Sequence, residues 1–513
     1  MGDRAILLEV DAVGEVLALL AGLEASRPDG VVDLVPAART VLVRVDPVVL
    51  PLAAARAWAL SQRIDGAHEQ TPGALVDLAI VYDGPDLLDT ARSLGLTVDE
   101  LVRRHSSAEW TVAFTGFAPG FGYLVSDDWG FDVPRLAAPR TRVPQGAVGL
   151  AGRYTGAYPR ETPGGWRLIG TTSATLFDPD AASPALLTPG ARVRFRPGAG
   201  RAAVTAGSGD ASGEPTVREP AAPGERGVRI IEPGLLATLQ DLGRPGSAAL
   251  GVAVSGALDR GALRIANRLV GNPEGAAAIE VTMGGLRAVA ECDTWFAVAG
   301  AWGPVLLDGH DVDPYEAHAW PAGAELHLGW FAHGARAYLA VRGGMLGRPV
   351  LGSLSTDLLA GLGPARLVAG SHVPIGRPPH EPVPVTDLAP WGAPPDELEL
   401  ELAPGPRADW FAASALAALF EATWTVGAAA DRVGVRLEGP ALARVRDGEL
   451  ASEGMVPGAL QVPPDGRPTI LCADGPVTGG YPVIAVATDA ALDLLAQARP
   501  GTRIRFRHAR QRV

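Results

Sequence analysis

The sequence predicts a mainly β, multidomain protein with a small α+β unit at its N-terminus. Three observations predict this class. A length of 513 residues is too long for one compact core. From residue 76 onward, short strand-like runs alternate with Gly and Pro. Only the first 75 residues alternate strand-like and helix-like patterns, which is typical of a small α+β unit.

The first expected domain covers residues 1–75. It begins with the strand-like RAILLEV, continues with a helical stretch over 13–23 and paired strands in VVDLVPAARTVLVRV, and ends with a helix over 52–64. Residues 76–197 follow, ending in TPGARVRFRP. Their short, evenly spaced strands predict a β-barrel.

A second break in the pattern falls at residues 198–226, which lack hydrophobic periodicity and contain no aromatic residue. That composition predicts a flexible linker. Beyond it the chain is β-rich again, and a Pro-rich passage around 377–395 divides it. We therefore expect two further barrel-like domains, over 227–380 and 381–513.

An internal repeat relates the two predicted barrels at 76–197 and 381–513. VPQGAVGL is followed by RVRFRP after 48 residues, counted from Pro144 to Arg192, and MVPGALQV is followed by RIRFRH after 46 residues, from Pro457 to Arg503. Strands that begin with a Pro/Gly turn are common in all-β folds, so unrelated barrels are the alternative. The matching spacing favours one shared plan.

Composition and charge exclude several function classes. Hydrophobic residues make up 47% and charged residues 20%, as in an ordinary globular protein, and no apolar run reaches the roughly 18 residues of a membrane span. The N-terminal segment has no signal-peptide pattern, so we expect a cytoplasmic protein. A net charge of −13 argues against a nucleic-acid partner.

Cysteine and lysine usage narrows the chemistry further. Cys292 and Cys472 lie in apolar, strand-like contexts without CxxC spacing, so we expect buried thiols and no metal site. The sequence contains no lysine, and all 44 basic residues are arginine. This excludes a Schiff-base lysine, a Walker P-loop and a biotinyl-lysine within this chain. Genomic base composition is the simple explanation of the bias.

Two motifs before the linker carry the first functional signal. FTGFAPGFGYL places glycines at expected tight turns, and PRTRVPQGAVGLAGRYTGAYPRETPGGWRLIGTT strings five arginines along short strands. Arginines in this arrangement receive carboxylate or phosphate groups, although a packed turn and a solvated strand face are the alternatives. Residues 2–197 resemble subunit 1 of the allophanate-hydrolase-like family, which also includes the B subunit of 5-oxoprolinase and the sporulation kinase inhibitors.

The region after the linker carries five ordered motifs, among them GVAVSGALDRGALRIANRLVGNPEGAAAIEVTMGG, DRVGVRL and SEGMVPGALQVPPDGRPTILCADGPVTGGYPVIA. They resemble subunit 2 of the same family, otherwise the C subunit of 5-oxoprolinase. The chain is thus identified as a fusion of two subunit types that pair with each other, related to urea amidolyase, with a homo-oligomer as a further option. The resemblance implies cyclophilin-like β-barrels.

The same resemblance implies ATP-dependent opening of 5-oxoproline to glutamate, with ATP and Mg²⁺ and a separate third subunit of the LamB/YcsF type. The first alternative is carboxyl transfer to a urea- or amide-type nitrogen, with biotin on a separate carrier. The second is a non-enzymatic module like the kinase inhibitors. Allophanate hydrolysis itself is rejected, because its Ser-Ser-Lys triad requires lysine.

Candidate site residues follow from residue chemistry within these motifs. Glu453, Asp474 and Asp259 are candidate acid/base or metal-bridging carboxylates. His105 is a candidate acid/base, although a capping or strand-edge histidine is the favoured interpretation. The candidates for substrate or nucleotide binding are Gly120, Tyr123, Arg140, Arg142, Gln145, Tyr158, Trp166, Ser255, Ser355, Thr356, Arg432, Gln461, Thr478, Gly479, Gly480 and Tyr481.

Structural alternatives remain for most of these binding candidates. Ser and Thr in glycine-flanked turns usually bond to local backbone, and Trp166 and Tyr481 either line a pocket or fill a core. We expect the cleft at the contact between the two halves, lined by residues 139–172 and 452–485.

Overall fold

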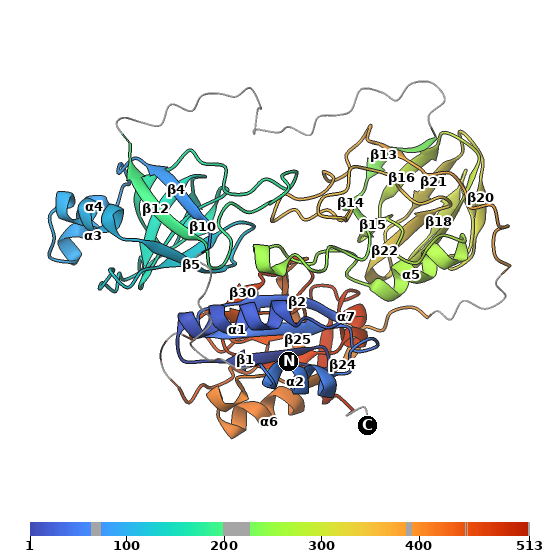
Figure 1. The fold of residues 1–513 in the computed structure, drawn as a ribbon. Coiled ribbons are helices and arrows are strands. Elements are labelled where there is room, and N and C mark those ends of the chain that lie inside the picture. The colour runs from blue at the N-terminus through green and yellow to red at the C-terminus, as the bar shows by residue number, and fades with distance from the viewer. Residues whose placement is uncertain (63–72, 199–225, 386–391, 447, 449, 511–513) are drawn as a thin grey trace.

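The computed structural model describes residues 1–62, 73–198, 226–385, 392–446, 448 and 450–510 (Figure 1). The predicted linker therefore lies outside the described residues, apart from its two end residues. We name four units. The N-terminal unit is 1–62, the first barrel 73–198, the sandwich unit 226–385 and the second barrel 392–510. Their strand-rich build confirms the predicted mainly β, multidomain fold class.

The N-terminal unit is a three-stranded antiparallel sheet with two helices on one face. Its elements are β1 (Ala5–Glu9), α1 (Val13–Ala25), β2 (Val31–Pro36), β3 (Thr40–Val45) and α2 (Leu52–Leu60), with strand order β1-β3-β2. Helix α1 forms because Val16, Leu19, Leu20 and Leu23 recur at helical spacing and are buried against the sheet. This is the α+β arrangement expected from the sequence.

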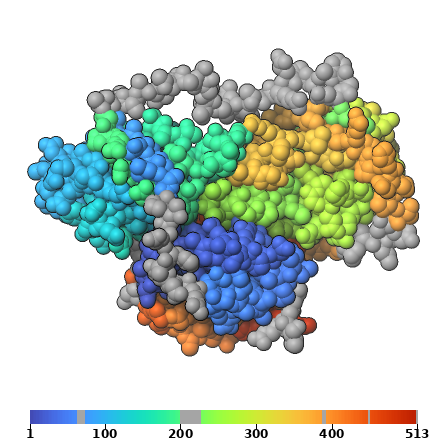
Figure 2. All heavy atoms as spheres, in the orientation of Figure 1, coloured from blue at the N-terminus to red at the C-terminus, as the bar shows by residue number. Residues whose placement is uncertain are grey.

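Both faces of that sheet are buried. Successive side chains of β3 point to opposite faces, so apolar residues of this strand reach both. Val41, Val43 and Val45 point to the helices, whereas Leu42 points to the opposite face. There Leu42 joins a core with Met455 and other residues of the second barrel. The N-terminal unit therefore covers the second barrel, although the first barrel follows it in sequence (Figures 1 and 2).

The first barrel is a seven-stranded sheet with two helices and a separate two-stranded ribbon. Its elements are β4 (Leu75–Ile80), α3 (Leu87–Ser93), α4 (Val98–Ser107), β5 (Trp110–Thr115), β6 (Gly122–Val125), β7 (Arg140–Val143), β8 (Ala147–Ala151), β9 (Tyr154–Ala157), β10 (Thr162–Gly164), β11 (Arg167–Thr171) and β12 (Arg192–Pro197). The sheet order is β11-β8-β9-β6-β5-β12-β4, and β7 pairs with β10. A bridge between Val81 and Thr171 links the two ends of the sheet.

The sandwich unit has two sheets packed face to face, where we expected one barrel over 227–380. Its elements are β13 (Gly227–Pro233), β14 (Leu236–Gln240), η1 (Ala248–Leu250), α5 (Arg260–Leu269), β15 (Ala278–Thr282), β16 (Leu286–Ala290), β17 (Thr294–Trp302), β18 (Val305–Leu307), β19 (His310–Asp311), β20 (His318–Trp320), β21 (Glu325–Leu328), β22 (His333–Val341) and β23 (His372–Pro374). The orders are β19-β18-β21-β16-β13-β23 and β14-β15-β22-β17-β20. One core joins the sheets, and α5 packs on the second through small residues.

The second barrel is a closed seven-stranded barrel. Its elements are β24 (Glu397–Pro404), η2 (Ala408–Trp410), α6 (Ala413–Glu421), β25 (Trp424–Ala430), β26 (Gly434–Glu438), β27 (Glu453–Gly454), β28 (Ala459–Gln461), β29 (Thr469–Leu471), β30 (Thr478–Gly479), β31 (Val483–Ala487), α7 (Asp489–Leu495) and β32 (Arg503–His508). The order is β24-β31-β28-β29-β26-β25-β32, and β27 pairs with β30.

The two barrels share one strand order, which confirms the plan inferred from the internal repeat. Every strand of the first barrel has its counterpart at the same place in the second, and the ribbon β7–β10 corresponds to β27–β30. The likeness extends to side chains. Trp110 begins β5 and donates to the carbonyl of His105 at 3.0 Å, while Trp424 begins β25 and donates to the carbonyl of Leu419 at 3.1 Å.

The segment around η1 joins three of the units. The Gly120 amide of the first barrel donates to the Leu250 carbonyl at 2.9 Å, and the Ala248 amide donates to Asp33 of the N-terminal unit at 3.2 Å. Figure 1 shows η1 between the first barrel, the sandwich unit and the N-terminal unit. In the described parts of the chain, no helix combines the length and apolar character needed to cross a bilayer.

Candidate functional site

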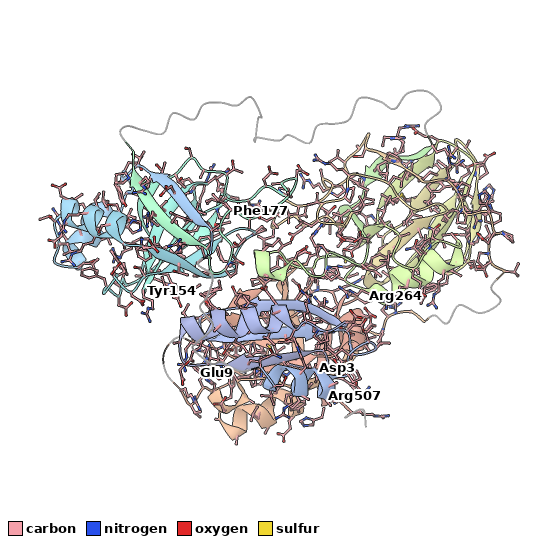
Figure 3. The ribbon with its side chains drawn as sticks, viewed as in Figure 1. Asp3, Glu9, Tyr154, Phe177, Arg264 and Arg507 are labelled. Carbon is pink, nitrogen blue, oxygen red and sulfur yellow. The ribbon has the colours of Figure 1, made fainter. Side chains whose placement is uncertain are left out.

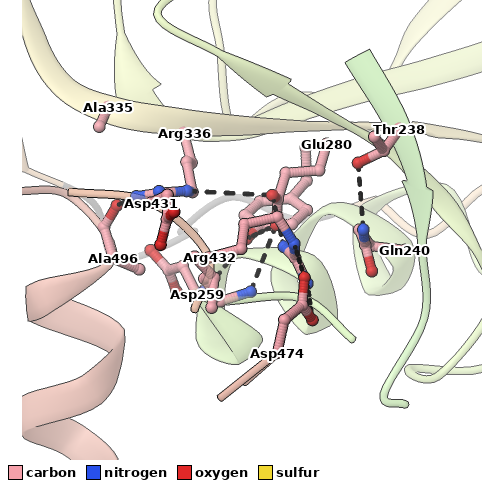
Figure 4. A network of polar contacts seen from close by, with 12 residues as sticks. Thr238, Gln240, Asp259, Glu280, Ala335, Arg336, Asp431, Arg432, Asp474 and Ala496 are labelled. Carbon is pink, nitrogen blue, oxygen red and sulfur yellow. Dashed lines mark hydrogen bonds and ion pairs between the residues drawn. The ribbon is translucent and has the colours of Figure 1, made fainter. Parts of the chain in front are cut away.

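Four of the predicted site residues meet in one buried ionic network between the sandwich unit and the second barrel (Figure 4). Arg432 binds both carboxylate oxygens of Asp474, through Nε at 2.8 Å and Nη2 at 3.1 Å. The Ser255 hydroxyl donates to the same carboxylate at 2.7 Å. The sequence places these residues far apart, and the fold brings them into direct contact.

Glu280 is the second carboxylate of this network, offset by Arg336 at 3.9 Å, and was missed from the sequence. Arg432 Nη1 donates to Glu280 Oε1 at 2.7 Å, and the hydroxyl of Tyr338 donates to Glu280 Oε2 at 2.7 Å. The pairing of β15 with β22 places Glu280 directly opposite Tyr338. A lone acid in the apolar run AAAIEVT was the available signal, because a charge in a buried strand needs a partner.

Electrostatics keep Arg432 and Glu280 charged inside the protein. Burial opposes the charge on Arg432, but Asp474 and Glu280 outweigh it and raise its pKa. Burial likewise opposes the charge on Glu280, while Arg432 and Arg336 outweigh it and lower its pKa. Charge-assisted hydrogen bonds at these distances are the strong kind.

Asp259, the fourth predicted residue, caps helix α5 at the edge of the network. Its carboxylate accepts from the Ala262 amide at 2.8 Å and from Gln497 Nε2 at 2.6 Å. Its own amide donates to the Tyr338 hydroxyl at 2.9 Å. Burial, followed by the neighbouring Asp493, raises the pKa of Asp259 to about 7.

The network positions a chain segment and is itself closed to solvent. Ser255 is fully buried in the left-handed region at φ 53°, and Gly256 follows at φ 89°. The Gly256 carbonyl accepts from Arg432 Nη2 at 2.6 Å. Such a strained, over-determined turn is typical of a functional site. Here it fixes residues 254–260, which form one wall of a cavity.

That cavity, which we call the junction cavity, lies where the N-terminal unit, the sandwich unit and the second barrel meet. Its volume is ≈ 330 Å³. Its charged lining comprises Arg4, Arg44, Arg260, Arg264 and Arg336 together with Asp46, Asp431, Asp489 and Asp493. Figure 3 shows Arg264 on the edge of the sandwich unit that faces the other two units. The volume lies at the lower end of the range for small-molecule sites.

Two other predicted residues organise a turn. Ser355 donates to the carboxylate of Asp241 at 2.5 Å, and Thr356 donates to the Pro364 carbonyl at 2.8 Å. Both are buried. Thr356 follows the local-backbone alternative described for Ser and Thr in turns, whereas Ser355 bonds to a carboxylate distant in sequence, and neither hydroxyl is left free for a ligand.

His105 lies in the core of the first barrel and does not line the junction cavity. Its ring nitrogens bond to the hydroxyls of Tyr82 at 2.7 Å and Thr155 at 2.9 Å. Burial lowers its pKa to about 3, so the ring stays neutral. Leu419 holds the equivalent place in the second barrel. The structure therefore corrects the candidate acid/base assignment, because His105 is a core residue, and it is neither a cap nor a strand-edge residue.

The predicted residues of the two ribbons lie at equivalent places in the two barrels. Arg140 pairs with Asp86 at 2.6 Å, and Arg142, whose side chain is 75% exposed, pairs with Glu161 at 2.6 Å. On the other ribbon, Glu453 is buried and pairs with Arg407. Burial raises the pKa of Glu453.

The remaining candidates divide into packed and open positions. Tyr123, Tyr158 and Trp166 belong to one aromatic cluster of the first barrel, and Gly120 has its amide bonded. Gln461 and Thr478 are buried, and a Cβ on Gly479 would meet the Gln461 side chain at 2.6 Å. The open positions are Gln145, Gly480 and Tyr481, the last 47% exposed.

Two contacts involve the second of the segments, 139–172 and 452–485, that were expected to line a cleft. Thr478 packs against Gly116 of the first barrel, and the Ala38 amide of the N-terminal unit donates to the Ser452 carbonyl at 3.0 Å. The N-terminal unit and η1 thus fill part of the space between the two barrels. In the described ranges, no group of three or more His, Cys, Asp or Glu side chains is placed to hold a metal ion.

Comparison with known families shows what the chain resembles. Residues 250–508 match the family described as carboxyltransferase domain, subdomain A and B, and residues 1–187 match subdomain C and D. The chain is 39% identical over 284 residues to the C subunit of 5-oxoprolinase from Escherichia coli K12, covering 54% of this chain and 90% of that protein.

Three further likenesses cover other parts or all of the chain. It is 50% identical over 125 residues to the B subunit of 5-oxoprolinase from Escherichia coli O157:H7, which is 24% of this chain and 57% of that protein. It is 32% identical over 305 residues to urea amidolyase of Saccharomyces cerevisiae, 54% of this chain and 16% of that protein. The crystal structure of TTHA0988 superposes with TM-score 0.86 at 36% identity, covering 98% of this chain and 99% of that one.

Proposed function

Because this chain belongs to the carboxyltransferase subdomain A and B family, with the B and C subunits of 5-oxoprolinase among its relatives, we propose that it is a component of an ATP-dependent 5-oxoprolinase. The reaction converts 5-oxo-L-proline, ATP and water to L-glutamate, ADP and phosphate. One observation carries the proposal. A single chain combines a match to 90% of one C subunit with a match to 57% of one B subunit.

The chemistry requires a second component. Hydrolysis of the lactam is coupled to ATP, which activates the carbonyl by phosphorylation before water attacks. The described site offers arginines and hydrogen bonds for anions, whereas the predicted Ser hydroxyls are buried and bonded. We therefore propose that a separate LamB/YcsF-type protein, with ATP and Mg²⁺, supplies the reacting groups that this chain does not present, and that the reaction takes place in the cytoplasm.

The exposed residues of the two ribbons are the positions that a substrate or partner reaches. Arg142 and Gln145 lie at the first ribbon and Tyr481 at the second, all with exposed side chains. We assign them to this contact surface. The shared strand order places the two ribbons at equivalent positions in the two barrels. Their surroundings differ, because β7 is largely exposed whereas β27 is buried.

A coupled assay tests the proposal. The purified chain, mixed with a candidate LamB/YcsF-type protein, should release ADP and glutamate in equal amounts from ATP and 5-oxoproline, and neither protein should do so alone. Omitting 5-oxoproline controls for idle ATP hydrolysis. If no glutamate is released with any LamB/YcsF-type protein encoded beside this chain, the proposal is refuted.

Carboxyl transfer is the second candidate, supported by the family description and by the likeness to urea amidolyase. Since the chain has no lysine, biotin would have to arrive on a separate carrier. Transfer of labelled CO₂ from a carboxybiotin carrier to urea, with no glutamate released from 5-oxoproline, would favour this candidate over the first.

A further inference from the structure

The junction cavity is built by segments from both ends of the sequence and from its middle. Arg4 and Arg44 come from the N-terminal unit, Arg260 from the start of α5, and Arg336 from β22. The mouth is open to solvent, because the side chains of Asp489 and Arg264 are 70% and 46% exposed. A small solute therefore has access to the guanidinium groups inside.

Most charges around the cavity already have partners. Arg4 pairs with Asp489, and Arg44 pairs with Asp33 at 3.2 Å. Asp493 is also engaged, because it accepts the backbone amide of Arg260 at 2.9 Å. The N-terminal amide of α5 is thus occupied by a protein carboxylate, so any ligand must be recognised by side chains.

Arg260 is the exception among these charges. Within the described part of the chain, no carboxylate lies within ion-pair distance of its guanidinium, which donates to the Leu242 carbonyl at 3.5 Å and is attracted by Asp493 from farther away. Burial, and next to it the charge of Arg44, lowers the pKa of both Arg4 and Arg260 to about 10. The lining holds five arginines against four aspartates, so one positive charge remains unmatched, and an anion bound there would offset it.

We propose that the junction cavity is a binding site for a small anion, whose carboxylate or phosphate group is held by the guanidinium groups of Arg260 and Arg44. Arginine suits this role because its planar guanidinium binds either group through two hydrogen bonds. Apolar walls from Val254, Leu258 and Leu492 accommodate the body of an organic anion. Since Arg44 and Arg260 belong to different units, the bound anion links the N-terminal unit to the sandwich unit.

Calorimetric titration of the full chain tests this site independently of any enzymatic turnover. The probes are inorganic phosphate, 5-oxoproline and L-glutamate, with the neutral lactam 2-pyrrolidinone and sodium chloride at equal ionic strength as controls. We expect saturable binding of phosphate or of the carboxylates, and none of the controls. Phosphate alone would assign the site to phosphate, and the organic acids alone would assign it to carboxylates.

The decisive variant is Arg260→Met, which keeps the aliphatic stem and removes the charge. It should weaken anion binding by about tenfold or more, as loss of a bidentate charged contact does. Without anion it should be at least as heat-stable as the parent chain, since it relieves repulsion with Arg44. The matched control is Arg268→Met on the same helix, whose side chain is 61% exposed and which does not line the cavity.

Two results would overturn the proposal. One is the absence of saturable binding for all three anions while the chain is folded. The other is unchanged anion affinity in Arg260→Met together with unchanged affinity in Arg268→Met. Neither result bears on the coupled assay for glutamate, so failure of this site and failure of the proposed enzymatic function are separable.

Discussion

Arg432→Met should be among the most damaging single changes on the interface between the sandwich unit and the second barrel. Arg432 comes from the second barrel, and it bonds to Glu280 and to the Gly256 carbonyl across the interface as well as to Asp474 in its own unit. Methionine fills similar space but leaves Asp474 without its cation and leaves Glu280 with only the more distant Arg336, at 3.9 Å.

The expected loss is about 3–5 kcal/mol in the free energy of unfolding, the cost of breaking a buried ion pair by removing one partner. Glu280 is 1% exposed and the Asp474 side chain 2%, so water cannot replace the guanidinium. In the variant, burial without the opposing charge of Arg432 raises the pKa of Glu280. The variant should therefore lose stability as the pH rises through that value and regain it at lower pH.

Urea denaturation followed by tryptophan fluorescence measures this loss. A multidomain chain need not unfold in one step, so the first transition is the quantity to compare. The control is Arg436→Met, an exposed arginine on β26 of the same barrel, which should cost less than about 0.5 kcal/mol. Replacing Glu280 by Gln and Asp474 by Asn in the Arg432→Met background should recover part of the loss.

A loss below about 1 kcal/mol for Arg432→Met would refute this reasoning, because it would mean that the network does not bind the two units together. A full loss that the two carboxylate replacements leave unchanged would refute the electrostatic cause and point to packing alone.

Three other outcomes are expected. Asp259→Asn should flatten the pH dependence of stability. With the pKa raised from 3.8 to about 7, the native chain loses at most about 4 kcal/mol as pH rises from 4 to 7, and Asn keeps the cap without titrating. His105→Leu should cost no more than about 2 kcal/mol and leave glutamate release unchanged, because Leu419 fills the equivalent place. A protease site inserted within 199–225 and cut should leave the two fragments together on gel filtration, whereas Leu42→Ala, at about 2–5 kcal/mol, should promote their separation.

The sequence predicted the two related barrels because their signal is local. A turn with Pro and Gly ahead of one strand and an alternating Arg/Phe final strand keep nearly the same spacing in both barrels. The structure places these strands at β8 and β12 and at β28 and β32. The first domain could also be predicted, since apolar residues recur at helical spacing in α1 and side chains alternate between two faces in β3.

The sequence could not predict which residues cover each surface, because this depends on contacts between segments that are distant in the chain. The alternation in β3 shows that Leu42 is apolar on the face opposite the helices, but not that Met455 covers it. Arg432 and Glu280 are 152 positions apart and meet only through the fold. We selected candidates as charged or titratable side chains within short motifs. This criterion selected Arg432 of the network, but it also selected His105, which is a core residue.

The position of the N-terminal unit has a consequence for how the chain folds during synthesis. Its strands β1 to β3 leave the ribosome before the surface of the second barrel that covers Ala5, Val35 and Leu42. Until the second barrel is made, an apolar face of the sheet stays uncovered, and such a face promotes aggregation and chaperone binding. Because both parts belong to one chain, the covering barrel is made in equal number and close by, so the joining of two subunit types limits how long this face stays uncovered after the barrel is made.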